Sequence, residues 1–304
     1  MQLNIKPWTR LTLLTIGFLV FFPSLVSAIG WWGIKHNWDG STPWFNMMTT
    51  SAAYMGPNAL PIPQLREGLV ENQFQFEFRP EAHFSKGDDT YNLYTSFITP
   101  LRGIASFEVF LVPFEYYKMD TITRDERLAR SYNAEGHAGG DFWFGTNIQI
   151  VKDKRFPDLL FSAYFKTASG TNLADARYTD APGYYLLLNA GKSIIINKEK
   201  NIQLRFFGHL GTFIWQTWSD VNSQDDAVVY GIGARIQNSK YFFKADFSGY
   251  HGYLDNGDRP NAIKIQTGTY NNKLNVIARY QIGINDFDYQ TIGISLIYQF
   301  GKKW

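Results

Sequence analysis

Two short stretches of the sequence carry residue types that could support chemistry. His83 and Ser85 lie two residues apart, a spacing at which a histidine can act as the base for a serine nucleophile. The run from Tyr250 to Asp258 contains His251 and the sequence Asp-Asn-Gly-Asp over 255–258, whose oxygen atoms could bind a cation. The spacing of an EF-hand is absent, however, and Asp-Asn-Gly-Asp is a common turn composition. We therefore interpret this run as a loop and predict no metal site.

Composition excludes several other functions. The 304 residues include no cysteine, which rules out disulfides, thiolate zinc sites and cysteine nucleophiles. The remaining histidines, at 36, 137 and 209, show no metal-ligand spacing. The formal net charge is +2, and two of the basic residues, Lys6 and Arg10, precede residue 29. Without them the chain is neutral, so charge gives no reason to expect nucleic acid as a partner. We predict no cofactor.

The elements that must position these residues are β-strands. From Glu71 onward, apolar and polar residues alternate with a period of two, as in Phe74, Phe76 and Phe78. We predict about twelve strands, with ten to fourteen possible, each long enough to cross a bilayer when tilted. They fall at 71–84, 91–99, 104–116, 140–151, 159–168, 183–195, 202–217, 227–236, 241–253, 262–269, 274–284 and 289–300.

The connections between these strands differ systematically in length. The odd-numbered connections, counted from the first, include the long ones, 117–139 and 169–182. The even-numbered connections are mostly tight turns, such as 237–240 and 270–273. A soluble sandwich has no reason to sort its loops in this way, but a transmembrane barrel does. Backbone groups inside a bilayer must also be bonded internally, which forces the sheet to close. The sequence therefore predicts an all-β fold, a closed antiparallel transmembrane β-barrel over residues 71–304.

Two segments precede the barrel. Residues 1–28 have the pattern of a signal peptide: a basic start, an apolar stretch from Leu11 to Phe22, and small residues at Val26-Ser27-Ala28. We predict export and cleavage after Ala28. Residues 29–70 carry four tryptophans, and Pro57, Pro61 and Pro63 favour an ordered extended run. We expect this extension to lie in the periplasm or inside the lumen.

The inward rows of the predicted strands carry charges of both signs. Basic residues dominate strands seven to eleven, and acidic residues dominate strands one and three. The predicted lumen-lining residues are Glu77, Arg79, Glu81, Glu108, Lys166, Arg205, His209, Arg235, Lys244, Asp246, Lys264 and Arg279. Such a lining either holds a plugged barrel closed or biases which solutes pass through a narrow pore. The basic majority predicts a mild preference for anions, and Arg205 and Arg235 on neighbouring strands could grip one carboxylate. The run Arg124-Asp125-Glu126-Arg127 we interpret as a solvated charge run on one short exposed helix.

Two resemblances to known families add to this interpretation. Thr291, Gly293, Leu296 and Tyr298 resemble the C-terminal assembly signal of Gram-negative outer-membrane proteins, and the chain looks like uncharacterised barrels of the Bacteroidota. The resemblance implies an outer-membrane location, contact with lipids and lipopolysaccharide, and insertion by the barrel-assembly machinery through the last strand. Such proteins usually end on an aromatic residue, whereas Phe300 is followed here by Gly-Lys-Lys-Trp304.

The second resemblance concerns His83 and Ser85. They are similar to the His-x-Ser motif of outer-membrane phospholipase A and the lipid A deacylases. The next residue is Lys86, where the phospholipase pattern has asparagine, and the period-two alternation turns both residues inward, whereas that family's site faces lipid. We therefore predict no enzymatic activity and expect a narrow passive channel for small hydrophilic, mildly anionic solutes. The alternatives are a structural or adhesive barrel that presents its long loops, and a lipolytic enzyme using His83 and Ser85.

Overall fold

The computed structural model describes residues 30–152, 155–270 and 272–303. The predicted signal peptide lies outside these residues. Two compact units divide the chain at Thr42 and Pro43. In the first, the helix α2 (Trp31–Lys35) brings the Trp32 ring within 5.9 Å of the Trp38 ring, centroid to centroid. Hydrogen bonds from Thr42 and Ser41 hold the pKa of the Asp39 carboxyl well below its usual range.

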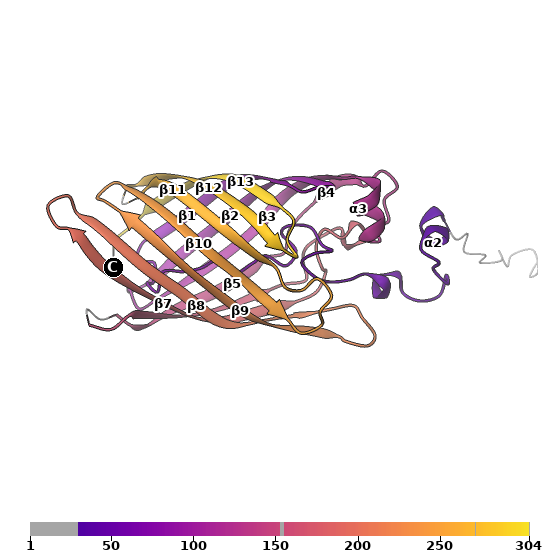
Figure 1. Cartoon of the computed structure of the whole chain (residues 1–304), viewed down its shortest axis with the longest axis horizontal. Coiled ribbons are helices and arrows are strands. Elements are labelled where there is room, and N and C mark those ends of the chain that lie inside the picture. The colour runs from indigo at the N-terminus through magenta and orange to yellow at the C-terminus, as the bar shows by residue number, and fades with distance from the viewer. Residues whose placement is uncertain (1–29, 153–154, 271, 304) are drawn as a thin grey trace, which may run out of the picture. The chain divides into compact units, whose positions relative to one another are not determined.

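The second unit is a closed antiparallel barrel of twelve strands (Figure 1). Neighbours in sequence pair with one another, and β1 closes the sheet by pairing with β13 from Phe74–Phe300 to Phe84–Gln290. The strands are β1 (Phe74–Phe84), β2 (Asp88–Leu101), β3 (Ala105–Met119), β5 (Trp143–Val151), β6 (Asp158–Lys166), β7 (Gly183–Asn197), β8 (Ile202–Gln216), β9 (Gln224–Gln237), β10 (Tyr241–Gly252), β11 (Asn261–Thr269), β12 (Leu274–Asn285) and β13 (Gln290–Phe300).

A thirteenth strand does not belong to the barrel wall. The short β4 (Glu135–Ala138) pairs only with residues Glu115 to Lys118 at the end of β3. The wall partner of β3 is β5, which pairs with Ala105 to Phe110. The extra hairpin explains why β3 runs three residues beyond its predicted end at 116. Every other predicted strand end also agrees with the structure to within three residues.

The connections sort by length as predicted. One end of the barrel, here called the loop end, carries the connections 85–87, 120–142, 167–182, 217–223, 253–260 and 286–289. They include the helix α3 (Thr121–Glu126) and the short helix η2 (Leu173–Asp175). The other end, called the turn end, carries 102–104, 152–157, 198–201, 238–240 and 270–273. Long loops at one end and short turns at the other are typical of outer-membrane barrels, whose long loops face outside the cell.

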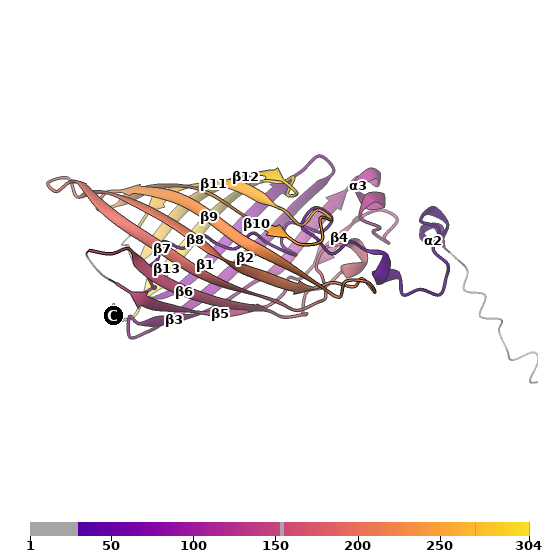
Figure 2. The same ribbon diagram turned by 60° about the horizontal axis from the view of Figure 1, so that its bottom comes forward.

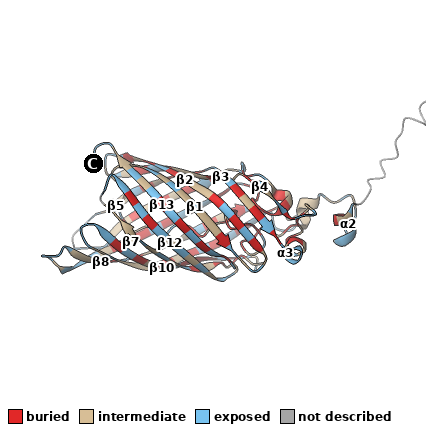
Figure 3. Cartoon of the chain, turned by 90° about the horizontal axis from the view of Figure 1, so that it is seen from above, coloured by how far each residue is buried: buried red, intermediate tan, exposed pale blue. Residues whose placement is uncertain are grey.

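Burial alternates along each strand (Figure 3). In β13, Ile292, Ile294 and Leu296 are exposed, whereas Thr291 and Ser295, on the alternate positions, are buried. The outer surface is thus apolar and the inner surface is polar, the reverse of a soluble barrel and the arrangement that lipid requires. None of the helices in the described residues is long and apolar enough to cross a bilayer.

The lumen contains the protein's own chain. Residues 43–70, here called the luminal segment, begin with the short helix η1 (Trp44–Met47) and then run inside the barrel to the start of β1 (Figures 1 and 2). Met55, Ala59, Leu60 and Leu65 are almost completely buried. Side chains of this segment therefore form part of the barrel's core, which a barrel of twelve strands is wide enough to hold.

The outward apolar row gives a test of membrane insertion. Ile232 lies within β9 and its side chain is 69% exposed. Replacing it with lysine (Ile232→Lys) should cost roughly 2–4 kcal/mol if the side chain meets the middle of a bilayer. We expect less folded protein in lipid vesicles, measured as heat-modifiable mobility on gels. The control is Tyr253→Lys in the 253–260 loop, where the side chain is 84% exposed and no lipid contact is expected. Equal folding of both variants would contradict a lipid-facing surface at Ile232.

Candidate functional site

The candidate site is the lumen together with the segment that occupies it. An extended chain forms no hydrogen bonds with itself, so its backbone groups need partners from the wall. Tyr250 donates a hydrogen bond to the carbonyl of Leu60 (3.0 Å), and Lys244 donates one to the carbonyl of Leu65 (3.0 Å). Further towards the turn end, the side-chain amide of Gln149 donates to the carbonyl of Gly68 (2.9 Å). Polar side chains of the wall therefore hold the luminal segment by its backbone.

Two consecutive residues of the luminal segment carry its formal charges, and they point to different parts of the wall. The Arg66 guanidinium pairs with the Glu108 carboxylate of β3 and donates to the Tyr164 hydroxyl of β6. The Glu67 carboxylate lies 3.2 Å from the guanidinium of Arg235 on β9 and 3.6 Å from the ammonium of Lys244 on β10. Each charge therefore meets the opposite charge on the wall.

The predicted pair Arg205 and Arg235 does surround one carboxylate residue, but that residue is Glu67. The two arginines are register partners on β8 and β9. Arg235 contacts the Glu67 carboxylate, whereas Arg205 donates two hydrogen bonds, of 2.9 and 2.7 Å, to the Glu67 carbonyl oxygen. Arg205 also pairs with Asp158 at 2.7 Å. The protein's own chain thus occupies the position that we predicted for a solute.

The structure places all twelve predicted lumen-lining residues inside the barrel, where most are paired. Glu77 contacts both Arg79 and Arg279, and Arg79 also contacts Glu81. The ammonium of Lys264 lies 3.4 Å from the carbonyl of Ile62 and in the electrostatic field of Asp246. His209 is buried beside Gly231. The remaining members are Glu108, Arg205, Arg235 and Lys244, described above, and Lys166, described below.

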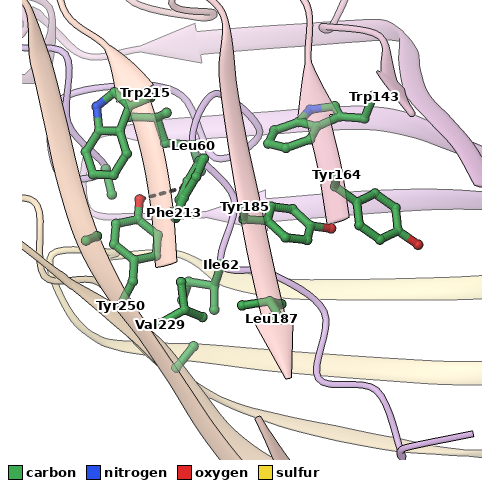
Figure 4. Close-up of a cluster of buried hydrophobic side chains, with 13 residues drawn as sticks. Leu60, Ile62, Trp143, Tyr164, Tyr185, Leu187, Phe213, Trp215, Val229 and Tyr250 are labelled. Atoms are coloured by element: carbon green, nitrogen blue, oxygen red, sulfur yellow. Dashed lines mark hydrogen bonds between the residues drawn. The ribbon is translucent and has the colours of Figure 1, made fainter. Parts of the chain in front are cut away.

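One part of the lumen is aromatic, which the sequence analysis missed. Trp143, Tyr185, Phe213, Trp215 and Tyr250 project inward from four strands, β5, β7, β8 and β10, and pack with residues of the luminal segment (Figure 4). Their segment partners are Ala52, Leu60 and Ile62. The indole nitrogen of Trp215 donates to the carbonyl of Thr50 (3.0 Å). These side chains fill this part of the lumen with packed apolar surface, as in the core of a soluble protein.

The long loops form a buried polar network at the loop end. Arg177, from the 167–182 connection, is fully buried and contacts the carboxylates of Asp88 (2.6 Å) and Glu115 (2.8 Å). Burial by itself would lower the pKa of Arg177, but Glu115 and Asp88 more than offset this and raise it. Arg127 contacts the same Asp88 carboxylate at 2.6 Å. Two loops are therefore fixed across this end by one carboxylate.

This network corrects one prediction. We expected Arg124-Asp125-Glu126-Arg127 to be a solvated charge run on an exposed helix. The helix α3 exists, but Arg124 and Arg127 are both buried, because Arg127 reaches Asp88 and Arg124 donates to the carbonyl of Tyr132 (2.7 Å). Lys166 lies nearby at the end of β6, paired with Asp141 at 2.8 Å. Burial raises the pKa of Asp141, and Lys166 only partly offsets that effect.

His83 and Ser85 are not arranged as a catalytic pair. The ring nitrogens of His83 face Thr291 Oγ1 (2.8 Å) and Asn92 Oδ1 (2.5 Å). The hydroxyl of Ser85 donates instead to the carbonyl of Asp88 (3.1 Å). His83 is buried in the lumen, as the strand alternation predicts, and Ser85 lies in the 85–87 turn. The geometry therefore gives no base for a Ser85 nucleophile.

The run from Tyr250 to Asp258 forms a strand end and a turn. The carboxylate of Asp258 accepts hydrogen bonds from the backbone N–H groups of Leu254 (2.8 Å) and Asp255 (3.0 Å). His251 is exposed at the end of β10. Among the described residues, no cluster of three or more His, Cys, Asp or Glu side chains is arranged to bind a metal.

A cavity of about 180 Å³ remains between the luminal segment and the wall. Its lining includes Pro63 and Arg66 from the segment and three basic wall residues, Arg79, Lys264 and Arg279. Acidic, neutral polar and aromatic groups complete the lining, among them Glu81, Asp141, His83, Tyr94, Trp143 and Tyr185. A cavity lined by charged groups and aromatic rings can hold a small molecule whose polar groups meet the charges.

The sequence analysis missed two groups of charged residues. Arg66, Glu67 and Asp158 pair with predicted residues, whereas Arg177 pairs with Asp88 and Glu115 at the loop end. One signal could have found the first two. Between Asp39 and Glu71, Arg66 and Glu67 are the only residues with a formal charge. Buried charges on the barrel wall require partners of opposite charge. In a segment that lies inside the lumen, Arg66 and Glu67 are the residues that can supply them.

The contacts of Glu67 predict a measurable loss of stability. Removing one partner of a buried ion pair costs roughly 3–5 kcal/mol. Because the Glu67 side chain is 20% exposed, we expect Glu67→Gln to cost less than that. The variant should have a lower thermal unfolding midpoint in detergent. The control is Glu199→Gln, the same substitution at an exposed position in the 198–201 turn. Equal midpoints for both variants would show that the Glu67 contacts add nothing to stability.

Comparisons with known proteins give structural relatives only. No protein-family model and no curated protein sequence matches the chain. Among solved structures, the COG4313 outer membrane channel from Pseudomonas putida F1 matches with a TM-score of 0.52 and 8% identity, over 78% of this chain and 99% of that one. The KdgM porin matches with a TM-score of 0.41 and 8% identity, over 74% of this chain and 99% of the porin. At these identities the likeness to the Pseudomonas channel shows the fold alone. The chain therefore has the fold of an outer-membrane β-barrel.

Proposed function

We propose that the protein is an outer-membrane channel for small hydrophilic solutes, with the luminal segment as its resident plug. The observation that supports this best is the charged cavity of about 180 Å³ beside the segment. A barrel with a purely structural role could fill its lumen with apolar side chains, and one part of this lumen is filled in that way. The other part keeps buried charges and open space. Buried charges cost stability, and a pathway for solutes would explain why they are kept.

We propose a mild preference for anions, with small carboxylates and acidic sugars as solutes. The wall from β8 to β12 contributes Arg205, Arg235, Lys244, Lys264 and Arg279, against two buried acids, Asp225 at the loop end of β9 and Asp246. Glu67 neutralises part of this basic surface while the segment is in place. The preference should therefore be weak in the resting protein and stronger when Glu67 is removed or displaced.

A second candidate function is a structural or adhesive barrel that presents its long loops to a partner. It is favoured by the rigid fixing of the 120–142 and 167–182 connections through Arg127, Arg177 and Asp88. Under either function, we propose that the barrel contacts outer-membrane lipid and lipopolysaccharide and is inserted by the assembly machinery through β13. Lipolysis has no support from the geometry of His83 and Ser85.

A glycine of the wall provides a way to loosen the plug. A methyl group on Gly191 of β7 would overlap the carbonyl oxygen of Glu67 and lie within 3.0 Å of the Arg205 guanidinium. We expect Gly191→Ala to increase single-channel conductance in planar bilayers, because the segment must move while the strand itself tolerates alanine. The control is Gly208→Ala on β8, whose methyl group would meet only Gly231 and Ile232 of the wall.

Both outcomes bear on the function. Small steps for the wild type and larger ones for Gly191→Ala are the expected result. An absence of steps at high salt in the wild type and in Gly191→Ala would contradict a channel and leave the loop-presenting barrel. Correct folding of each variant is checked by its heat-modifiable mobility.

Selectivity is tested by the reversal potential in a salt gradient. Glu67→Gln leaves Arg235 and Lys244 without their carboxylate, so the potential should shift towards greater anion selectivity than in the wild type. Glu199→Gln, at the exposed turn, should leave it unchanged. A shift towards cations in Glu67→Gln would contradict the proposed preference.

A further inference from the structure

We infer that the luminal segment crosses the outer membrane inside the barrel, entering from the cell surface, so that Pro43 is presented outside the cell. The proposal concerns the direction of the segment and does not depend on whether the lumen conducts. Its basis is the order in which the segment contacts the wall and the loops.

The segment begins among the long loops. Asn46 donates a hydrogen bond to Asp220 in the 217–223 connection (2.7 Å), and the Phe45 ring packs on Trp218 of the same connection, with centroids 4.9 Å apart. The Arg130 guanidinium, from the 120–142 connection, lies over the Trp44 ring at 4.7 Å. All of these partners belong to the loop end.

The next contacts are still at that end. The backbone N–H of Ala53 donates to the carbonyl of Gly257 (3.0 Å), in the 253–260 connection. The backbone N–H of Gly56 donates to the carbonyl of Ala176 (2.7 Å), in the 167–182 connection. Met48, Met55 and Ala59 pack with Leu173 and Ala176 in one apolar cluster. Four different loops therefore close around the point of entry.

From there the segment passes steadily to the turn end. Leu60 and Leu65 meet Tyr250 and Lys244 of β10 in that order, moving away from the loop end of the strand. Gly68 then lies against Gly191 of β7, where a methyl group on Gly68 would come within 2.7 Å of the Gly191 nitrogen. The backbone N–H of Val70 donates to Gln149 of β5 (2.9 Å), near the turn end of that strand.

The two ends of the barrel face opposite sides of the membrane, so the order of these contacts gives the direction in which the segment crosses. The segment leads directly into β1, whose first residue, Phe74, pairs with Phe300 at the turn end. Short turns face the periplasm and long loops face outside. The chain therefore begins its passage outside, crosses the membrane through the lumen to the periplasmic side, and only then starts the first strand of the wall. An extension lying under the barrel would instead contact the turn end alone.

Cysteine labelling on intact cells tests this direction, and the natural absence of cysteine makes every introduced thiol unique. The probe is Pro43→Cys, at an exposed position, with Tyr54→Cys, at a position 38% exposed near the start of the segment, as a second probe should the first fail to fold. Val221→Cys in the 217–223 connection, 88% exposed, marks the loop end. Glu199→Cys in the 198–201 turn, also exposed, marks the turn end. The reagent is a membrane-impermeant maleimide, applied before and after lysis, and each variant is first checked for heat-modifiable mobility.

The proposal expects Pro43→Cys and Val221→Cys to react fully on intact cells, and Glu199→Cys to react only after lysis. Reaction of the Pro43 and Tyr54 probes only after lysis, with Val221→Cys reactive on intact cells, would overturn it, because the segment would then start in the periplasm. Reaction of Glu199→Cys on intact cells would also overturn it, by reversing the barrel. Conductance measurements decide the channel function separately, so either proposal can fail without the other.

Discussion

The structure depends on the match between two adjacent residues, Arg66 and Glu67, and a wall whose charges are unevenly distributed. The wall cations Arg235 and Lys244 are mostly buried, and so is the acid Glu108. Moving such groups out of water costs several kcal/mol each unless a partner is close. The segment supplies both signs within one dipeptide, directed to different sides. Segment and wall therefore stabilise one another. Without the segment, the wall charges Arg235, Lys244 and Glu108 would lose these partners inside the barrel.

The same contacts explain why the inward charges of the wall do not line an open pore. Lys244, Lys264 and Arg205 have the inward placement expected of a pore lining, yet each reaches a backbone carbonyl of the segment. An extended, proline-containing chain cannot satisfy those carbonyls itself. The inward cations thus act as hydrogen-bond donors to the luminal segment. The aromatic cluster around Trp215 and Tyr250 supplies the apolar packing of the segment.

Most of the barrel could be predicted from the sequence because a two-residue period carries the information. Rows such as Ile292, Ile294 and Leu296 show which face meets lipid, and loop lengths show which end is which. The path of residues 43–70 could not be predicted in this way. Its wall partners lie 34 or more residues away in sequence, and no periodic pattern in the segment indicates them. For the same reason the burial of Arg127 was missed: its partner Asp88 is distant in sequence, and a charge run at a helix end resembles a solvated surface.

The closed lumen also changes what the basic wall can do to an anion. A free carboxylate can contact Arg235 and Lys244 together only by taking the place of Glu67, which is held there by its own chain. A tethered group competes with an effective concentration on the order of millimolar or more. Weakly bound, dilute anions therefore leave the segment in place, whereas an anion that displaces Glu67 also removes a contact that holds the plug. Under the proposed preference for anions, recognition of an anion and loosening of the segment would be the same event.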